Sequence, residues 1–136
     1  MSATLKLEIV TPEAKVYSED VDMVTLPGIE GEMGVYPNHV PLMTQVVAGE
    51  VAVRKGSESY FLAVGDGFVE VTGDRVSILT DMAIGYDNID AAKAEEARRR
   101  AEARLAEKLE EEEVAAVNAA LAHSLAQLKV KRRSHS

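Results

Sequence analysis

The chain of 136 residues contains neither cysteine nor tryptophan. Without cysteine it has no disulfide bonds, no thiolate metal ligands and no cysteine nucleophile. Four tyrosines and two phenylalanines are its only aromatic residues, too few to favour a carbohydrate-binding or base-stacking surface. No apolar run approaches the roughly 18 residues of a transmembrane helix, and the N-terminal stretch lacks a signal-peptide pattern. We therefore expect a protein folded around an ordinary hydrophobic core.

Positive charge is scarce as well. The chain has 15 lysines and arginines against 23 aspartates and glutamates, a formal net charge of −8. Nucleic acid is excluded as a partner, because phosphate binding needs a positively charged surface. The whole net charge of −8 comes from residues 1–85, since residues 86–136 carry equal numbers of acidic and basic side chains.

Glycine and proline are missing from the last 51 residues, where alanine is frequent instead. All nine glycines and all four prolines lie at or before Gly85. Glycine and proline mark turns, whereas alanine is the best helix former. We predict two domains, a β-sandwich over residues 1–86 and an antiparallel two-helix hairpin over residues 87–136.

The first part alternates apolar and polar residues over short segments. Leu5, Leu7 and Ile9 follow a strand pattern, and Val21 and Met23 are expected to share one face of a further strand. Turn residues at 55–57, 65–67 and 72–74 separate later apolar segments, the first of them within a predicted hairpin. Turns at this spacing predict an antiparallel sandwich or barrel of about eight to ten strands.

The second part has apolar residues at helical spacing, with Asn88 or Asp90 as a candidate cap. One stripe comprises Ala94, Ala97, Ala101, Leu105 and Leu109, and a second Val114, Val117, Leu121, Leu125 and Leu128. The acidic run 110–113 between the stripes predicts a turn. One continuous helix remains an alternative, because glutamate is a good helix former. The alanine-rich seam predicts weak packing and hence a movable hairpin.

Candidate chemistry is sparse. Gly28, Gly31 and Gly34 do not match a dinucleotide-binding or phosphate-binding loop, and we interpret them as an irregular loop with positive backbone φ angles. Glu32 and His39 lie in or beside this loop and favour a contact surface over a metal site. No serine, histidine and aspartate are spaced as a catalytic triad. We predict no catalytic residue and no metal site.

Basic residues concentrate on the first predicted helix. Five of them are candidates for contact with an acidic partner: Arg98, Arg99, Arg100, Arg104 and Lys108. Residues 100, 104 and 108 are expected to stack on one helix face, where like charges repel weakly. The stripe is either a solvated helix face or a docking surface.

Several motifs together resemble the epsilon subunit of F-type ATP synthase. The segment around Gly34, Pro37, His39, Pro41 and Leu42 is similar to that family's G-x-x-P-x-H-x-P-L core. The strand entry VGDGFVEV and the last helix ALAHSLAQLKV are similar too, although Asp66 stands where glycine is usual. The order of sandwich and Ala-rich helices completes the resemblance.

The resemblance implies a non-catalytic rotor subunit in the central stalk of a proton-translocating enzyme. Its sandwich would bind the gamma subunit and the c ring, with Glu32 and His39 at these contacts. Its helices would extend toward the beta subunit and inhibit ATP hydrolysis, with the basic residues 98–108 meeting an acidic loop. The protein would lie at the cytoplasmic face of the bacterial cell membrane, attached only through the complex.

Some members of that family bind ATP on the folded hairpin through an I/L-D-x-x-R-A motif. The corresponding residues here are Ile89, Asp90, Lys93 and Ala94, with Arg100 as a further match. Lysine replaces the usual arginine, and a lysine ammonium cannot bind phosphate through two parallel hydrogen bonds. His123 and Gln127 also stand where strong binders have arginine, so the expected ATP binding is weak and no other cofactor is expected.

Two other functions stay open on the sequence. One is a stand-alone sandwich adaptor with a helical docking arm, and the other is a module whose main role is to sense nucleotide. Binding of gamma would distinguish the rotor-subunit hypothesis from the adaptor hypothesis. The affinity for ATP would test the nucleotide-sensor hypothesis.

Overall fold

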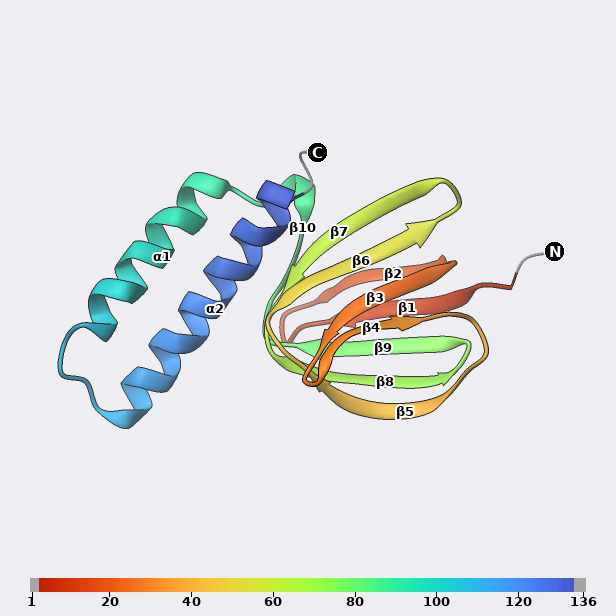
Figure 1. Ribbon diagram of the computed structural model, residues 1–136, viewed down its shortest axis with the longest axis horizontal. Helices are drawn as coiled ribbons and strands as arrows, with labels where there is room; N and C mark the ends of the chain where they lie inside the picture. The colour runs from red at the N-terminus through yellow and green to blue at the C-terminus, as the bar shows by residue number, and fades with distance from the viewer. Residues whose placement is uncertain (1–2, 134–136) are drawn as a thin grey trace.

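A computed structural model describes residues 3–133 of the chain. Ten strands are followed by a short 3-10 helix and two α-helices (Figure 1). The strands are β1 (Leu5–Val10), β2 (Lys15–Val21), β3 (Met23–Gly28), β4 (Gly31–Val35), β5 (His39–Val46), β6 (Gly49–Lys55), β7 (Glu58–Val64), β8 (Gly67–Gly73), β9 (Arg75–Thr80) and β10 (Ala83–Gly85). The helices are η1 (Tyr86–Asn88), α1 (Ala91–Leu105) and α2 (Glu111–Arg133). The predicted class, a β-sandwich followed by a helical hairpin, is confirmed.

The strands form one sheet that folds over on itself around an apolar core. Its order is β10-β7-β6-β3-β5-β8-β9-β1-β2, with β4 paired to β3. Alternate residues of each strand point inward, as for Leu5, Leu7 and Ile9, which are at most 1% exposed. The predicted hairpin around Gly56 joins β6 to β7, and Gly56 has a φ of 64°. A continuous core within the strands therefore holds the sandwich together.

The predicted face of the strand around residue 22 is wrong. β2 ends at Val21, and Asp22 forms a bend whose amide donates to Arg54 O at 2.9 Å. Asp22 Oδ2 accepts a hydrogen bond from Gly56 N at 2.7 Å. The bend shifts the alternation by one residue, so that Val24 is buried while Met23 is only half-buried.

The glycine-rich segment is a regular hairpin rather than the predicted irregular loop. β3 and β4 pair from Val24 with Val35 to Gly28 with Gly31. Gly31 has a φ of 124°, which is accessible to glycine because it has no Cβ. A Cβ on Gly28 would lie 2.9 Å from Gly31 O, so close approach explains this second glycine.

The helical part is a hairpin whose turn lies slightly before the predicted position. Asp90 caps α1, because its Oδ1 accepts a hydrogen bond from Lys93 N at 3.1 Å. α1 ends at Leu105, so Leu109 and Lys108 lie in the connection and not on the predicted helix stripes. The acidic residues 111–113 form the first turn of α2, where they suit the positive end of the helix dipole.

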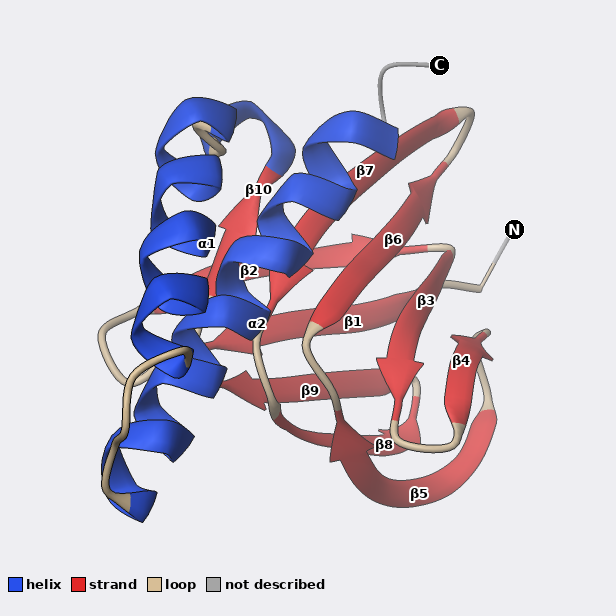
Figure 2. Ribbon diagram, turned by 60° about the vertical axis from the view of Figure 1, so that its left-hand side comes forward, coloured by secondary structure: helices blue, strands red, loops and turns tan. Residues whose placement is uncertain are grey.

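The hairpin docks on the sandwich through α2, which packs on β6 and β7 while α1 packs on α2 (Figure 2). Ala126 and Val130 join Ala63 and Ile89 in a second apolar cluster. Leu125 is 48% exposed, which contradicts its predicted place on the buried stripe. The buried residues of α2 are Ser124, Ala126, Leu128 and Val130.

Candidate interaction surfaces

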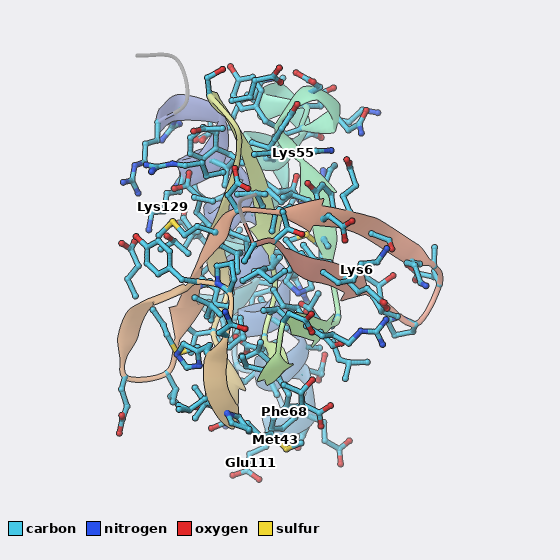
Figure 3. The ribbon with its side chains drawn as sticks, turned by 90° about the vertical axis from the view of Figure 1, so that its right-hand side faces the viewer. Lys6, Met43, Lys55, Phe68, Glu111 and Lys129 are labelled. Atoms are coloured by element: carbon cyan, nitrogen blue, oxygen red, sulfur yellow. The ribbon has the colours of Figure 1, made fainter. Side chains whose placement is uncertain are left out.

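An exposed apolar surface crosses three strands of the sandwich. Met43, Phe68 and Leu79 are 68%, 54% and 55% exposed. Phe68 is paired with Gln45 of β5 and with Leu79 of β9, so the three side chains follow one another across the outer face of β5, β8 and β9. Figure 3 shows Met43 and Phe68 at the same end of the molecule. We call Met43, Phe68 and Leu79 the apolar face.

Sequence reasoning did not identify the apolar face, although one local signal was present. Val69 and Val71 are fully buried, so the Phe68 side chain points to the outer face of β8, where a polar residue is usual. Leu79 likewise follows the buried Ile78. A large apolar residue on the outer face of a strand indicates a surface that another protein contacts.

The predicted contact residues Glu32 and His39 lie on different elements. Glu32 is exposed in the β3–β4 hairpin, opposite Pro27. His39 begins β5 opposite Gly73, and its Nδ1 lies 2.7 Å from Val40 O. Within residues 3–133, no group of three or more histidine, aspartate or glutamate side chains is arranged to hold a metal ion.

The arginines of α1 are paired with carboxylates of the hairpin itself. Arg98 contacts Glu95 and Glu102, and Arg99 Nε lies 3.5 Å from Glu95 Oε1. Hydrogen bonding to Arg98 lowers the pKa of Glu95. These pairs offset part of the positive charge of Arg98 and Arg99.

Two further arginines of the stripe border the groove between the helices. Arg100 Nη1 lies 2.8 Å from Glu96 Oε1, within the same helix. Arg104 contacts Glu107 at 2.7 Å and Glu113 at 3.0 Å, and the second contact links the two helices. Lys108 lies beyond the helix end, so the predicted stacking of residues 100, 104 and 108 is wrong.

The residues of the predicted nucleotide motif have structural roles in the docked hairpin. Ile89 and Ala94 are each 4% exposed and form part of the buried interior. Asp90 caps α1, and the Lys93 side chain is exposed. Arg100 lines a groove formed by alanines of both helices together with Arg104 and Val117, and Ile89, Asp90 and Lys93 are not among its lining residues.

Polar contacts fasten α2 to the sandwich, and sequence reasoning missed them. His123 Nε2 lies 3.0 Å from Asp81 Oδ1, and a Cβ on Gly65 would lie 2.8 Å from the same nitrogen. Arg133 Nη1 lies 3.1 Å from Oε1 of Glu50, whose side chain is only 6% exposed. Burial raises the pKa of Glu50, and the nearby Arg133 opposes that rise.

A sandwich with an apolar outer face and a helical hairpin docked on another part of its sheet defines a binding module. The family model of the ATP synthase delta/epsilon chain beta-sandwich domain matches residues 4–85, and that of its long alpha-helix domain matches residues 87–132. The chain belongs to the family of ATP synthase delta/epsilon chains.

Relatives from bacteria are similar over nearly the whole chain. The ATP synthase epsilon chain of Dehalococcoides mccartyi is 50% identical over 136 residues, covering 98% of this chain and 97% of the relative. That of Syntrophobacter fumaroxidans is 44% identical, covering 98% and 100%. A chain in the cryo-EM structure of the Euglena gracilis mitochondrial ATP synthase (OSCP/F1/c-ring) shares the fold, with a TM-score of 0.78, 24% identity and coverage of 98% and 82%.

No helix in the described part of the chain is both long and apolar enough to cross a membrane.

Proposed function

We propose that this chain is a non-catalytic rotor subunit in the central stalk of a proton-translocating F-type ATP synthase. Its membership of the delta/epsilon family and its similarity to bacterial epsilon chains support this role. The structural neighbour from Euglena gracilis belongs to an assembly that contains a c ring. In this role the protein lies at the cytoplasmic face of the bacterial cell membrane and attaches to it through the complex.

The apolar face is the observation that carries the proposal. Three large side chains, each more than half exposed, lie on adjacent strands of a sheet whose inner face already has its own core. Exposure of this kind is costly in a free subunit and is relieved when a partner covers it. We assign the apolar face to the gamma subunit and place Glu32 and His39 at the adjoining contacts with gamma and the c ring.

The experiment measures binding of purified gamma to the full chain. Phe68→Ser should weaken binding by about tenfold or more, because burial of a Phe side chain contributes on the order of 1.5–3 kcal/mol. Leu125→Ser is the matched control, since Leu125 is also about half exposed but lies on α2. Unchanged gamma affinity in a folded Phe68→Ser variant would contradict the assignment.

We further propose that the hairpin is a regulatory domain over residues 87–136, carried by a rotor-binding domain over residues 1–86. In the extended state its basic residues contact an acidic loop of the beta subunit and inhibit ATP hydrolysis; these residues are Arg98, Arg99, Arg100, Arg104 and Lys108. Among the described residues, the apolar cluster at the α2–sheet contact has only four buried residues, far fewer than the core of the sandwich, which supports a hairpin that can detach while the sandwich stays folded.

Weak ATP binding on the hairpin is the remaining part of the proposal. Ile89, Asp90, Lys93, Ala94 and Arg100 retain most of the family motif in sequence. Lys93 stands in place of arginine, and Arg100 is paired with Glu96, which reduces the charge available to phosphate. No other cofactor is assigned to the protein.

A further inference from the structure

The sheet has two ends, and their free edges face one another. Among the described residues, β2 pairs with β1 alone and ends the sheet on one side. On the other side, β10 covers only Leu62–Val64 of β7. The preceding four residues of β7, Glu58–Phe61, therefore pair with β6 on one edge and with no strand on the other. Uncovered edges of this kind offer backbone hydrogen-bonding groups to another strand.

A pocket of about 520 Å³ lies between these two edges. We call it the seam pocket; it is lined by Val16 and Tyr17 of β2, Ser59, Tyr60, Phe61 and Leu62 of β7, and residues 85–88. At one end of the pocket β2 leads into β3, where Asp22 N donates to Arg54 O of β6, and Lys55 of β6 contacts Glu19 of β2. Four of the six aromatic residues of the chain line the seam pocket, including Tyr86. Its volume is typical of a ligand site.

Polar groups at the seam pocket match the backbone of a peptide. Tyr17 Oη is buried and has no hydrogen-bond partner in the described part of the chain. Gly65 N, directly after β7, donates to Met82 O on the β10 side. Because amide groups along a strand alternate between its two edges, the amides of Ser59 and Phe61 point to that same side. The amides of Ser59 and Phe61 and the Tyr17 hydroxyl are thus available to pair with a ligand along the uncovered edge.

The charge around the seam pocket favours a basic ligand. Asp87 is the charged residue that lines the pocket, and the strands beside it carry three further carboxylates and one lysine: Glu19, Asp20, Glu58 and Lys15. The Tyr60 hydroxyl donates to Glu58. Lys15 is within 3.7 Å of Glu8, and Lys55 is paired with Glu19. Lys131 Nζ lies 4.0 Å from the centre of the Tyr86 ring, so the chain's own cation occupies this aromatic residue, and Asp87, Tyr60 and Phe61 are left for the basic side chains of a ligand.

We propose that the seam pocket binds an extended, positively charged peptide segment of another protein, which adds to the free edge of β7 as an extra strand. The peptide backbone pairs with the outward amides of Ser59 and Phe61, and its basic side chains meet Asp87 and the aromatic wall. This mode of binding needs a free edge, side-chain pockets and charge complementarity, all of which the seam pocket provides.

The experiment uses the full chain and a fluorescent N-acetyl-(Lys-Val)₃-amide peptide, with affinity measured by anisotropy and the site by amide chemical shifts. We expect shifts at residues 16–17 and 59–62, and binding about tenfold or more tighter than that of a matched (Glu-Val)₃ peptide. Ser59→Pro should weaken binding about tenfold or more, because proline removes the outward amide, while Ser59→Ala should bind like wild type. Tyr17→Phe should weaken binding about fivefold.

If Ser59→Pro fails to fold, the same question can be tested on the wild-type protein with a modified peptide. A (Lys-Val)₃ peptide methylated on alternate backbone nitrogens keeps its charge but cannot complete strand pairing, so wild-type protein should bind it about tenfold or more weakly. Equal binding of the methylated and unmodified peptides overturns the proposal. Equal binding of lysine amide alone, or chemical shifts confined to other residues, overturns it as well.

Discussion

A single buried carboxylate marks the contact between α2 and the sandwich. Glu50 Oε2 has no hydrogen-bond partner in the described residues, and Oε1 is held by Arg133. Burial raises the pKa of Glu50 above its ordinary value of 4.5, while Arg133 and then Lys129 act in the opposite direction. Relative to the unfolded chain, folding therefore makes ionisation of Glu50 less favourable, and ionised Glu50 costs stability at neutral pH.

This cost predicts a pH dependence of stability. As pH rises from 4.5 through the raised pKa of folded Glu50, its contribution to stability is lost, and acidification restores it. Glu50→Gln should flatten this part of the curve of unfolding free energy against pH, measured by urea titration. Glu13→Gln, at an exposed position between β1 and β2, is the matched control. A wild-type curve that keeps its shape in Glu50→Gln would show that Glu50 is not responsible.

Lys93 decides the strength of ATP binding in the proposed site. We predict a dissociation constant for ATP in the high micromolar range or weaker, about −5 kcal/mol or less favourable. Lys93→Arg should tighten binding several-fold, because a guanidinium can bind phosphate through two hydrogen bonds. Isothermal titration measures both constants, and Lys108→Arg controls for the substitution itself. Sub-micromolar binding by the wild-type chain would contradict the prediction.

At the scale of elements, the ion pairs of the hairpin would respond differently to the proposed extension. The pair Arg100–Glu96 lies within α1 and would survive separation of the helices. The pair Arg104–Glu113 joins α1 to α2 and would be lost. An acidic loop of the beta subunit would therefore replace an internal partner of Arg104, so each exposed contact yields only a small net gain.

Replacement of Arg100, Arg104 and Lys108 together by alanine should raise ATP hydrolysis in the reconstituted complex. Exposed contacts contribute about 0.2–1 kcal/mol each, and exchange of partners reduces the total, so we expect a rise of about two- to tenfold at low salt. Synthesis and gamma binding should stay near the wild-type level. The difference should shrink at high salt, where screening also weakens the wild-type contacts.

A charge-matched control separates this effect from a general loss of positive charge. Lys6, Lys15 and Arg75 carry the same total charge but lie on strands of the sandwich. Their replacement by alanine should leave hydrolysis unchanged. If the triple variant on the hairpin hydrolyses ATP no faster than wild type at low salt, its basic residues are only a solvated surface.

For the whole molecule, the sandwich contains a core that does not depend on the helices. The main cluster of buried apolar residues comes entirely from the strands. In the described part of the chain, the contact with α2 forms a separate cluster of four buried residues, Ala63, Ile89, Ala126 and Val130. Because this cluster is much smaller than the core and shares none of its described buried residues, removal of the hairpin should leave the sandwich folded.

A chain truncated after Asp87 should therefore fold and bind gamma with nearly full affinity. Circular dichroism and gel filtration measure folding, and a pull-down with gamma measures binding. The same fragment with Val69→Asp, a charge placed in the core, supplies an unfolded reference. A truncated chain that resembles this reference, or that folds without binding gamma, would contradict the proposed division of roles.

The sequence by itself determined the features that depend on a few neighbouring residues. Alternation as in Leu5, Leu7 and Ile9 predicted strands, because side chains of a strand point to opposite faces in turn. The absence of glycine and proline after Gly85 predicted helices, and Asp90, one of two candidate caps, is the residue that caps α1. The motifs were enough to indicate the family, while the proposed contacts and nucleotide site stay predictions.

Tertiary structure alone decided which distant residues meet. The bend at Asp22 reverses the alternation because its amide pairs with Arg54, 32 positions away in the chain. The register of β5, β8 and β9 assembles the apolar face, and docking of α2 leaves Leu125 exposed while Ser124 is buried. Local preferences act over a few residues, whereas register and docking depend on the combined packing of elements far apart in sequence.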